Sequence, residues 1–197
     1  MRPLDRPHAL RLKRVQGFTL IELMVVVAML ATLLALAAPS FRDMQKNSQV
    51  TTLGNEFVMG AAFARAEAIT RNQCVTMCIA KDWSATTPEC EDAKRDWNAG
   101  WIIFTNNKCD DKAKDASAEL LKVYLGDPSG PTMSAPAATD LRVVRFNSRG
   151  QTLLPAKALL SITPGGESTA TKEVCLDKTG RARIAKASST SCGTNLN

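Results

Sequence analysis

The feature that most constrains the fold is an apolar run, residues 18–38, whose only charged side chain is Glu22. A helix of this length spans about 31 Å, which is close to the thickness of the hydrocarbon core of a bilayer. Residues 1–17 carry five Lys or Arg and one acid. Because positive charges stay on the cytoplasmic side, the sequence predicts a single membrane span with the remainder of the chain exported.

Glu22 separates this run from ordinary export signals. A secretory signal peptide has a shorter apolar region followed by a small-residue cleavage site, and Ala37-Ala38-Pro39 gives no good site of that kind. A plain membrane anchor leaves the carboxylate unexplained, because a charge in lipid is costly and marks a function with a partner. The sequence therefore predicts a segment that does more than anchor the chain.

Residues 17–22, Gly17-Phe18-Thr19-Leu20-Ile21-Glu22, resemble the prepilin peptidase motif of type IV pilins and type II secretion pseudopilins. The resemblance implies cleavage after Gly17 by prepilin peptidase, N-methylation of Phe18, and assembly with other pilins or pseudopilins into a helical filament. It places the chain in the inner membrane, with a cytoplasmic leader and a periplasmic head, and then in a pilus or pseudopilus. Within the filament, Glu22 can neutralise the α-amine of a neighbouring subunit, since a paired buried charge is tolerated where a lone one is not.

The pattern beyond the apolar run predicts an α+β head. Apolar residues recur at helical spacing through residues 40–71 (Val50, Leu53, Phe57, Ala61, Ala64 and Ala68). This apolar stripe is expected to pack against a β-sheet. Strand-like runs follow at 74–80, 100–106, 120–126, 141–147, 158–163, 172–177 and 181–186. Residues 127–140, rich in Pro, Gly and Ser, are expected to form a surface loop. The predicted organisation is a cleaved leader (1–17), a membrane and filament-core helix (18–38), an amphipathic helix (39–72) and an antiparallel β-rich head (73–197).

Two stretches of the head resemble the GspH/FimT family of minor pilins and pseudopilins. Trp97-x-x-Gly100-Trp101-Ile102-Ile103-Phe104 resembles that family's W-x-x-G-W-x-x-F strand entry, and Gly180-Arg181-Ala182-Arg183 resembles the GRxR signature of the FimT branch. The resemblance implies a pilin-like fold. In the FimT branch it also implies capture of extracellular double-stranded DNA during natural transformation.

The charge distribution points to the same C-terminal region. Residues 141–197 hold nine Lys or Arg against three acids, whereas residues 18–140 hold eleven against fifteen. Residues 177–180 are expected to form a hairpin turn, and Arg181 and Arg183 then share one strand face about 7 Å apart. Paired guanidiniums suit phosphate oxygens and read no base sequence. The predicted DNA-binding residues are Lys178, Gly180, Arg181, Arg183 and Lys186.

Two alternatives to DNA binding remain open from the sequence. The arginines can belong to a solvated edge strand whose charges prevent aggregation. In that case the chain is type II secretion system protein H, a minor pseudopilin for protein secretion, or a minor pilin that primes assembly without touching DNA.

Six cysteines follow the apolar run and none precedes it, which favours disulfides in an oxidising compartment. We expect Cys175–Cys192 to close the C-terminal tail, at a stabilisation of roughly 3 kcal/mol in the chain-entropy picture. For the other four we suggest Cys78–Cys90 and Cys74–Cys109. A zinc site explains the cysteines less well than disulfides do, because no CxxC spacing occurs and the only histidine, His8, lies in the leader. Neither a metal, a cofactor nor an enzymatic activity is predicted.

Overall fold

The computed structural model describes residues 17–82, 87–91, 93, 95–109, 118–127, 129–136, 141–154, 158–165, 171–187 and 192. These residues divide into two compact units, one ending at Phe41 and the other beginning at Arg42. The predicted leader, residues 1–17, lies outside the described residues except for Gly17.

Helix α1 runs from Leu20 to Thr70 without interruption, for 51 residues. It contains a stretch with mean hydropathy 2.6, and none of that stretch is buried within the protein. By length and composition this stretch could cross a membrane. Between Leu20 and Leu36 the large apolar side chains are exposed.

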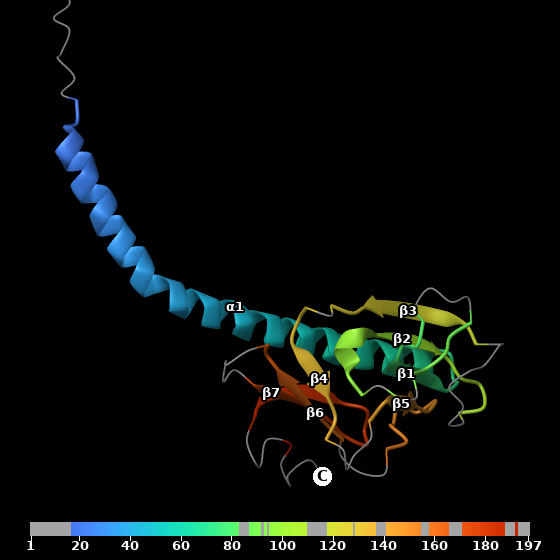
Figure 1. Cartoon of the computed structure of the whole chain (residues 1–197). Coiled ribbons are helices and arrows are strands. Elements are labelled where there is room, and N and C mark those ends of the chain that lie inside the picture. Colours follow the sequence, from blue (N-terminus) through green and yellow to red (C-terminus); the bar gives the residue numbers. More distant parts are fainter. Residues whose placement is uncertain are drawn as a thin grey trace, which may run out of the picture. The chain divides into compact units, whose positions relative to one another are not determined.

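The head, from Arg42 onward, contains two antiparallel four-stranded sheets (Figure 1). The first has the order β3-β2-β1-β5, and the second has the order β4-β6-β7-β8. A short 3-10 helix, η1, leads directly into β2. The bounds are β1 Val75–Ile79, η1 Trp97–Ala99, β2 Gly100–Thr105, β3 Leu120–Leu125, β4 Thr132–Ser134, β5 Val143–Phe146, β6 Ala158–Thr163, β7 Lys172–Leu176 and β8 Ala182–Lys186.

The apolar stripe of α1 forms the centre of the core, as the sequence predicted. Its six residues are at most 7% exposed and belong to one cluster with residues of both sheets. The ring of Phe57 meets the edges of Trp97 and Trp101, at centroid distances of 5.0 and 6.1 Å. The indole Nε1 of Trp97 donates a 2.8 Å hydrogen bond to the carbonyl of Leu141, which satisfies its buried polar atom. The predicted α+β architecture, a long helix packed on antiparallel sheets, is confirmed.

The expectation of a surface loop over residues 127–140 was wrong in part. Strand β4 lies within it, pairs with β6, and buries Met133 completely. The carboxylate of Asp96 holds this short strand against η1, because it accepts hydrogen bonds from the backbone N–H of both Met133 (2.9 Å) and Asn98 (3.0 Å). Three strand residues among Pro, Gly and Ser are too few to give a period-2 signal in the sequence.

Three disulfides brace the head. Their Cα–Cα distances are 5.3 Å for Cys74–Cys109, 5.6 Å for Cys78–Cys90 and 5.4 Å for Cys175–Cys192. These are the pairs that the sequence suggested. Cys78–Cys90 lies in a second, smaller apolar cluster with Ile102 and Phe104, on the other face of the first sheet.

Candidate functional sites

The first candidate site is the boundary between the leader and α1. Residues 17–19 precede the helix, and Phe18 is 82% exposed. Apart from Gly17 and its chain neighbours, no atom of the described residues lies within 4 Å of the position that a Cβ on Gly17 would occupy. A protease must draw an extended, accessible segment into its active site. The peptide bond between Gly17 and Phe18 lies in an exposed, non-helical stretch, which is compatible with such a cleavage.

Thr19 caps the N-terminus of α1, a role that was not predicted for it. Its hydroxyl Oγ1 accepts a 3.3 Å hydrogen bond from the backbone N–H of Glu22, and its carbonyl accepts one from Leu23 at 3.2 Å. Thr followed three residues later by Glu is the sequence signature of a capping box, and this signal could have identified the cap. The cap fixes Glu22 in the first turn, where a carboxylate also suits the positive end of the helix dipole.

The second candidate site is the basic hairpin, which we define as residues 172–186, comprising β7, a turn and β8. Within the described part of the chain, β8 pairs only with β7 and is therefore an edge strand. Ala182 and Ile184 pack against the core, which places Arg183 on the outer face, opposite Cys175 in the register. The side chains of the predicted set other than Gly180 are exposed: Lys178, Arg181, Arg183 and Lys186.

Asp177 organises the turn of the basic hairpin. Its Oδ1 accepts hydrogen bonds from the hydroxyl of Thr179 (2.6 Å) and the backbone N–H of Arg181 (3.0 Å). Burial pushes the pKa of Asp177 up, but the Thr179 hydroxyl, the backbone N–H groups of Arg181 and Thr179, and the charge of Arg181 together hold it below its usual value. The carboxylate is therefore ionised at neutral pH and tied into the turn.

Asp177 should make the hairpin acid-sensitive. Because its pKa is lower in the folded than in the unfolded chain, its stabilisation is complete above about pH 4 and is lost as the pH falls through the folded value. We expect Asp177→Asn to lower the melting temperature of the full-length protein at neutral pH, and this difference from wild type to shrink toward about pH 2. Circular dichroism melts of both proteins check this. An equal difference at both pH values would contradict it.

Gly180 lies buried on the inner side of the turn of the basic hairpin. It is buried with φ +79°, and a Cβ there would lie 2.2 Å from the carbonyl oxygen of Gly150, which itself has φ +74°. The same carbonyl accepts a 3.1 Å hydrogen bond from Nε of Arg65 on α1. Gly180 thus lets two turns meet at the helix, since only glycine accepts both the positive φ and the close approach. No local pattern reveals this meeting, because Arg65 lies 85 residues before Gly150.

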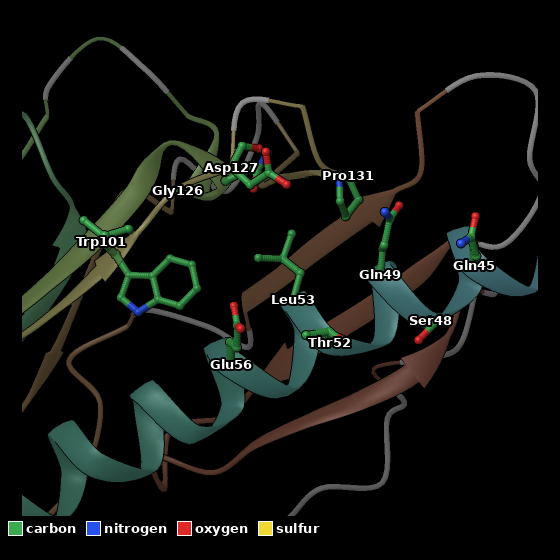
Figure 2. A pocket seen from close by; sticks show the side chains of 12 residues that line it. Gln45, Ser48, Gln49, Thr52, Leu53, Glu56, Trp101, Gly126, Asp127 and Pro131 are labelled. Atoms are coloured by element: carbon green, nitrogen blue, oxygen red, sulfur yellow. The ribbon is translucent and has the colours of Figure 1, made fainter.

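A hollow of about 440 Å³ lies elsewhere on the head, between α1 and residues 125–131 (Figure 2). Its α1 wall is mainly polar, with Gln45, Gln49 and Glu56 projecting from the helix as Figure 2 shows. Asp127 lies at the opposite rim. Two carboxylates make this hollow unfavourable for phosphate, so the basic hairpin is the better candidate for a nucleic acid.

Two models of known protein families match the chain, one over its N-terminal segment and one over most of the head. The family model of type II transport protein GspH matches residues 53–180, and that of the prokaryotic N-terminal methylation motif matches residues 12–38. The methylation motif covers the leader boundary and the apolar part of α1. The GspH match covers α1 from Leu53 onward and the head as far as Gly180.

Several known proteins resemble part of the chain. Two fimbrial proteins of Pseudomonas aeruginosa are each 30% identical over 129 residues, 65% of this chain and 79% of theirs. A type IV major alpha-pilin of Moraxella bovis is 44% identical over 45 residues, 23% of this chain and 28% of its own. Two crystal structures of the type IV minor pilin FimU of Pseudomonas aeruginosa share the fold, with TM-scores of 0.52 and 0.56 at 18% and 17% identity. They cover 72% and 76% of this chain and 98% of theirs.

Proposed function

The chain belongs to the type II transport protein GspH family, and from that membership we propose that it is a filament subunit whose basic hairpin binds DNA. It is a minor pilin or pseudopilin, a structural subunit and not an enzyme. The finer steps of the proposal are processing of the N-terminus, assembly through Glu22, and binding of double-stranded DNA through phosphates.

Processing begins with the chain in the inner membrane, its leader in the cytoplasm and its head in the periplasm. Prepilin peptidase cleaves after Gly17, and the new α-amine of Phe18 is methylated. The methylation motif and the accessible, non-helical residues 17–19 support this step.

Assembly follows when the apolar part of α1 leaves the bilayer for the filament core. There the carboxylate of Glu22 pairs with the Phe18 amine of a neighbouring pilin or pseudopilin. The proposal rests on Glu22 being the only charge in an otherwise apolar run, since an unpaired carboxylate in that setting is costly.

DNA binding rests on one observation. Strand β8 is an edge strand that turns Ala182 and Ile184 into the core and keeps Arg183 exposed on the other face. Arg181 is exposed just before the strand, and Lys186 is exposed at its end. A row of exposed cations at the sheet edge can follow a phosphate backbone, with each guanidinium presenting a planar fork of donors. In the filament setting, a subunit that holds DNA in this way contributes to DNA uptake.

We expect Arg181→Gln combined with Arg183→Gln to weaken DNA binding alike for every sequence and to flatten the salt dependence. Two lost phosphate contacts should reduce the slope of log affinity against log salt by up to about two. The measurement is fluorescence anisotropy of full-length protein in uncharged detergent micelles, with two unrelated duplexes across a salt series. Folding should survive, because exposed charges contribute little to stability.

The control removes the same charge elsewhere: Arg95→Gln with Lys108→Gln, two exposed positions outside the basic hairpin. It should leave the salt slope nearly unchanged. Failure of the wild-type protein to bind at low salt, or full binding by the Arg181 and Arg183 variant, would reject DNA binding. The match to type II transport protein GspH would then favour a pseudopilin of a secretion system or an assembly-priming minor pilin.

A further inference from the structure

A second hollow, of about 400 Å³, lies between α1 and the turn of the basic hairpin. The hairpin contributes Gly180, Arg181 and Ala182 to its wall. The wall from α1 is apolar apart from one guanidinium, that of Arg65, and consists otherwise of Val58, Ala62, Ala66 and Ile69. Two arginines from distant parts of the sequence thus line one hollow, and the apolar side chains of α1 form its floor.

Arg65 is held in place within this hollow. Its side chain is half-buried, and its Nε donates to the carbonyl of Gly150 at 3.1 Å. Gly180 packs against the same carbonyl, so close that a Cβ would clash with it. A guanidinium that is fixed through Nε still has its Nη donors for a second group, and fixing it beforehand lowers the entropy lost on binding.

The two charged residues that line the hollow, Arg65 and Arg181, are both cationic. Among the residues that the structure describes, no carboxylate forms an ion pair with Arg65. Arg149 and Lys178 lie next to the two turns that meet here, and both are exposed. Asp177 is the nearest acid in the hairpin sequence, and its carboxylate is tied into the turn.

We propose that this hollow is a phosphate subsite, in which Arg65 and Arg181 hold one phosphodiester group of a DNA strand and the apolar floor contacts the adjoining deoxyribose. The inference rests on the proposed function and extends it from the outer face of β8 to the surface of α1. A phosphodiester fits because its oxygens suit guanidinium donors while its flanking sugars carry apolar surface. The arginine from α1 makes the site depend on the folded head and not on the strand alone.

Two kinds of variant test the subsite in full-length protein in uncharged detergent, with the same duplexes and salt series. Arg65→Gln should weaken binding about tenfold and flatten the salt slope by about one, as for the loss of one charge-assisted phosphate contact. Because Arg65 also braces the Gly150 turn, a second pair leaves it in place. Ala66→Glu puts a carboxylate on the exposed wall of the hollow, and Ala66→Gln puts a neutral side chain of the same size there. The Glu variant should bind at least about tenfold more weakly than the Gln variant.

The outcomes separate the subsite from the proposed function. If wild-type protein does not bind DNA, the function itself fails. If wild-type protein binds but Ala66→Glu and Ala66→Gln bind equally well, the subsite is overturned while the outer face of β8 stands. The subsite is overturned in the same way if Ala66→Glu leaves DNA binding intact but reduces incorporation into filaments, because the hollow would then receive a neighbouring subunit.

Discussion

Glu22→Ala should leave the chain in the membrane but remove most of it from filaments. The substitution makes α1 more apolar, so insertion is at least as favourable as in the wild type. In the proposed filament pairing it leaves the α-amine of a neighbouring subunit without its partner, and breaking a buried ion pair typically costs about 3–5 kcal/mol. We therefore expect incorporation to fall by about tenfold or more, measured by immunoblotting of sheared filaments against the membrane fraction.

Two variants separate charge from packing at this position. Glu22→Gln keeps the size of the side chain and removes the charge, and it should fail as Glu22→Ala does. Leu23→Ala changes the neighbouring side chain without touching the charge, and it should incorporate far better. Normal incorporation of Glu22→Ala would show that no charge pairing is needed in the filament core.

Phe57→Ala should destabilise the head more than any exposed substitution on the same helix. Phe57 is fully buried and its ring contacts Trp97 and Trp101. Truncating a buried aromatic side chain leaves a cavity and costs about 3–5 kcal/mol. For a protein of this size that corresponds to a fall in melting temperature of roughly 10 °C, measured by circular dichroism with the disulfides intact.

Met59 provides the matched control. It lies two residues further along α1 and is 62% exposed. Met59→Ala should change the free energy of unfolding by no more than about 0.5 kcal/mol. An equally small loss of stability in Phe57→Ala and Met59→Ala would show that the two sheets do not depend on packing against the apolar stripe of α1.

The sequence predicts those parts of the fold that have a clear period. The stripe on α1 repeats every three to four residues, and every member is buried. The seven longer strands alternate or form apolar runs, and their positions agree with the structure to within a residue or two. Arg183 and Ile184 fall on opposite faces of β8 because successive side chains of a strand alternate.

The parts that could not be predicted depend on contacts between distant residues. Strand β4 exists because Asp96 and β6 hold three residues of a Pro-, Gly- and Ser-rich segment. Arg65 lies beside the basic hairpin where Gly150 and Gly180, two glycines in separate turns, meet at α1. A single sequence carries no signal for such a meeting, since each of these residues has an ordinary local context.

The identity of the mature N-terminus tests the central claim, that this chain is a processed filament subunit, most directly. Mass spectrometry of protein purified from membranes or filaments should find a chain that begins at Phe18 and carries one methyl group on its α-amine. Cleavage at that bond creates the amine that Glu22 is proposed to pair with, so assembly depends on it. A chain that still begins at Met1, or one cleaved beyond Ala38, would contradict the account.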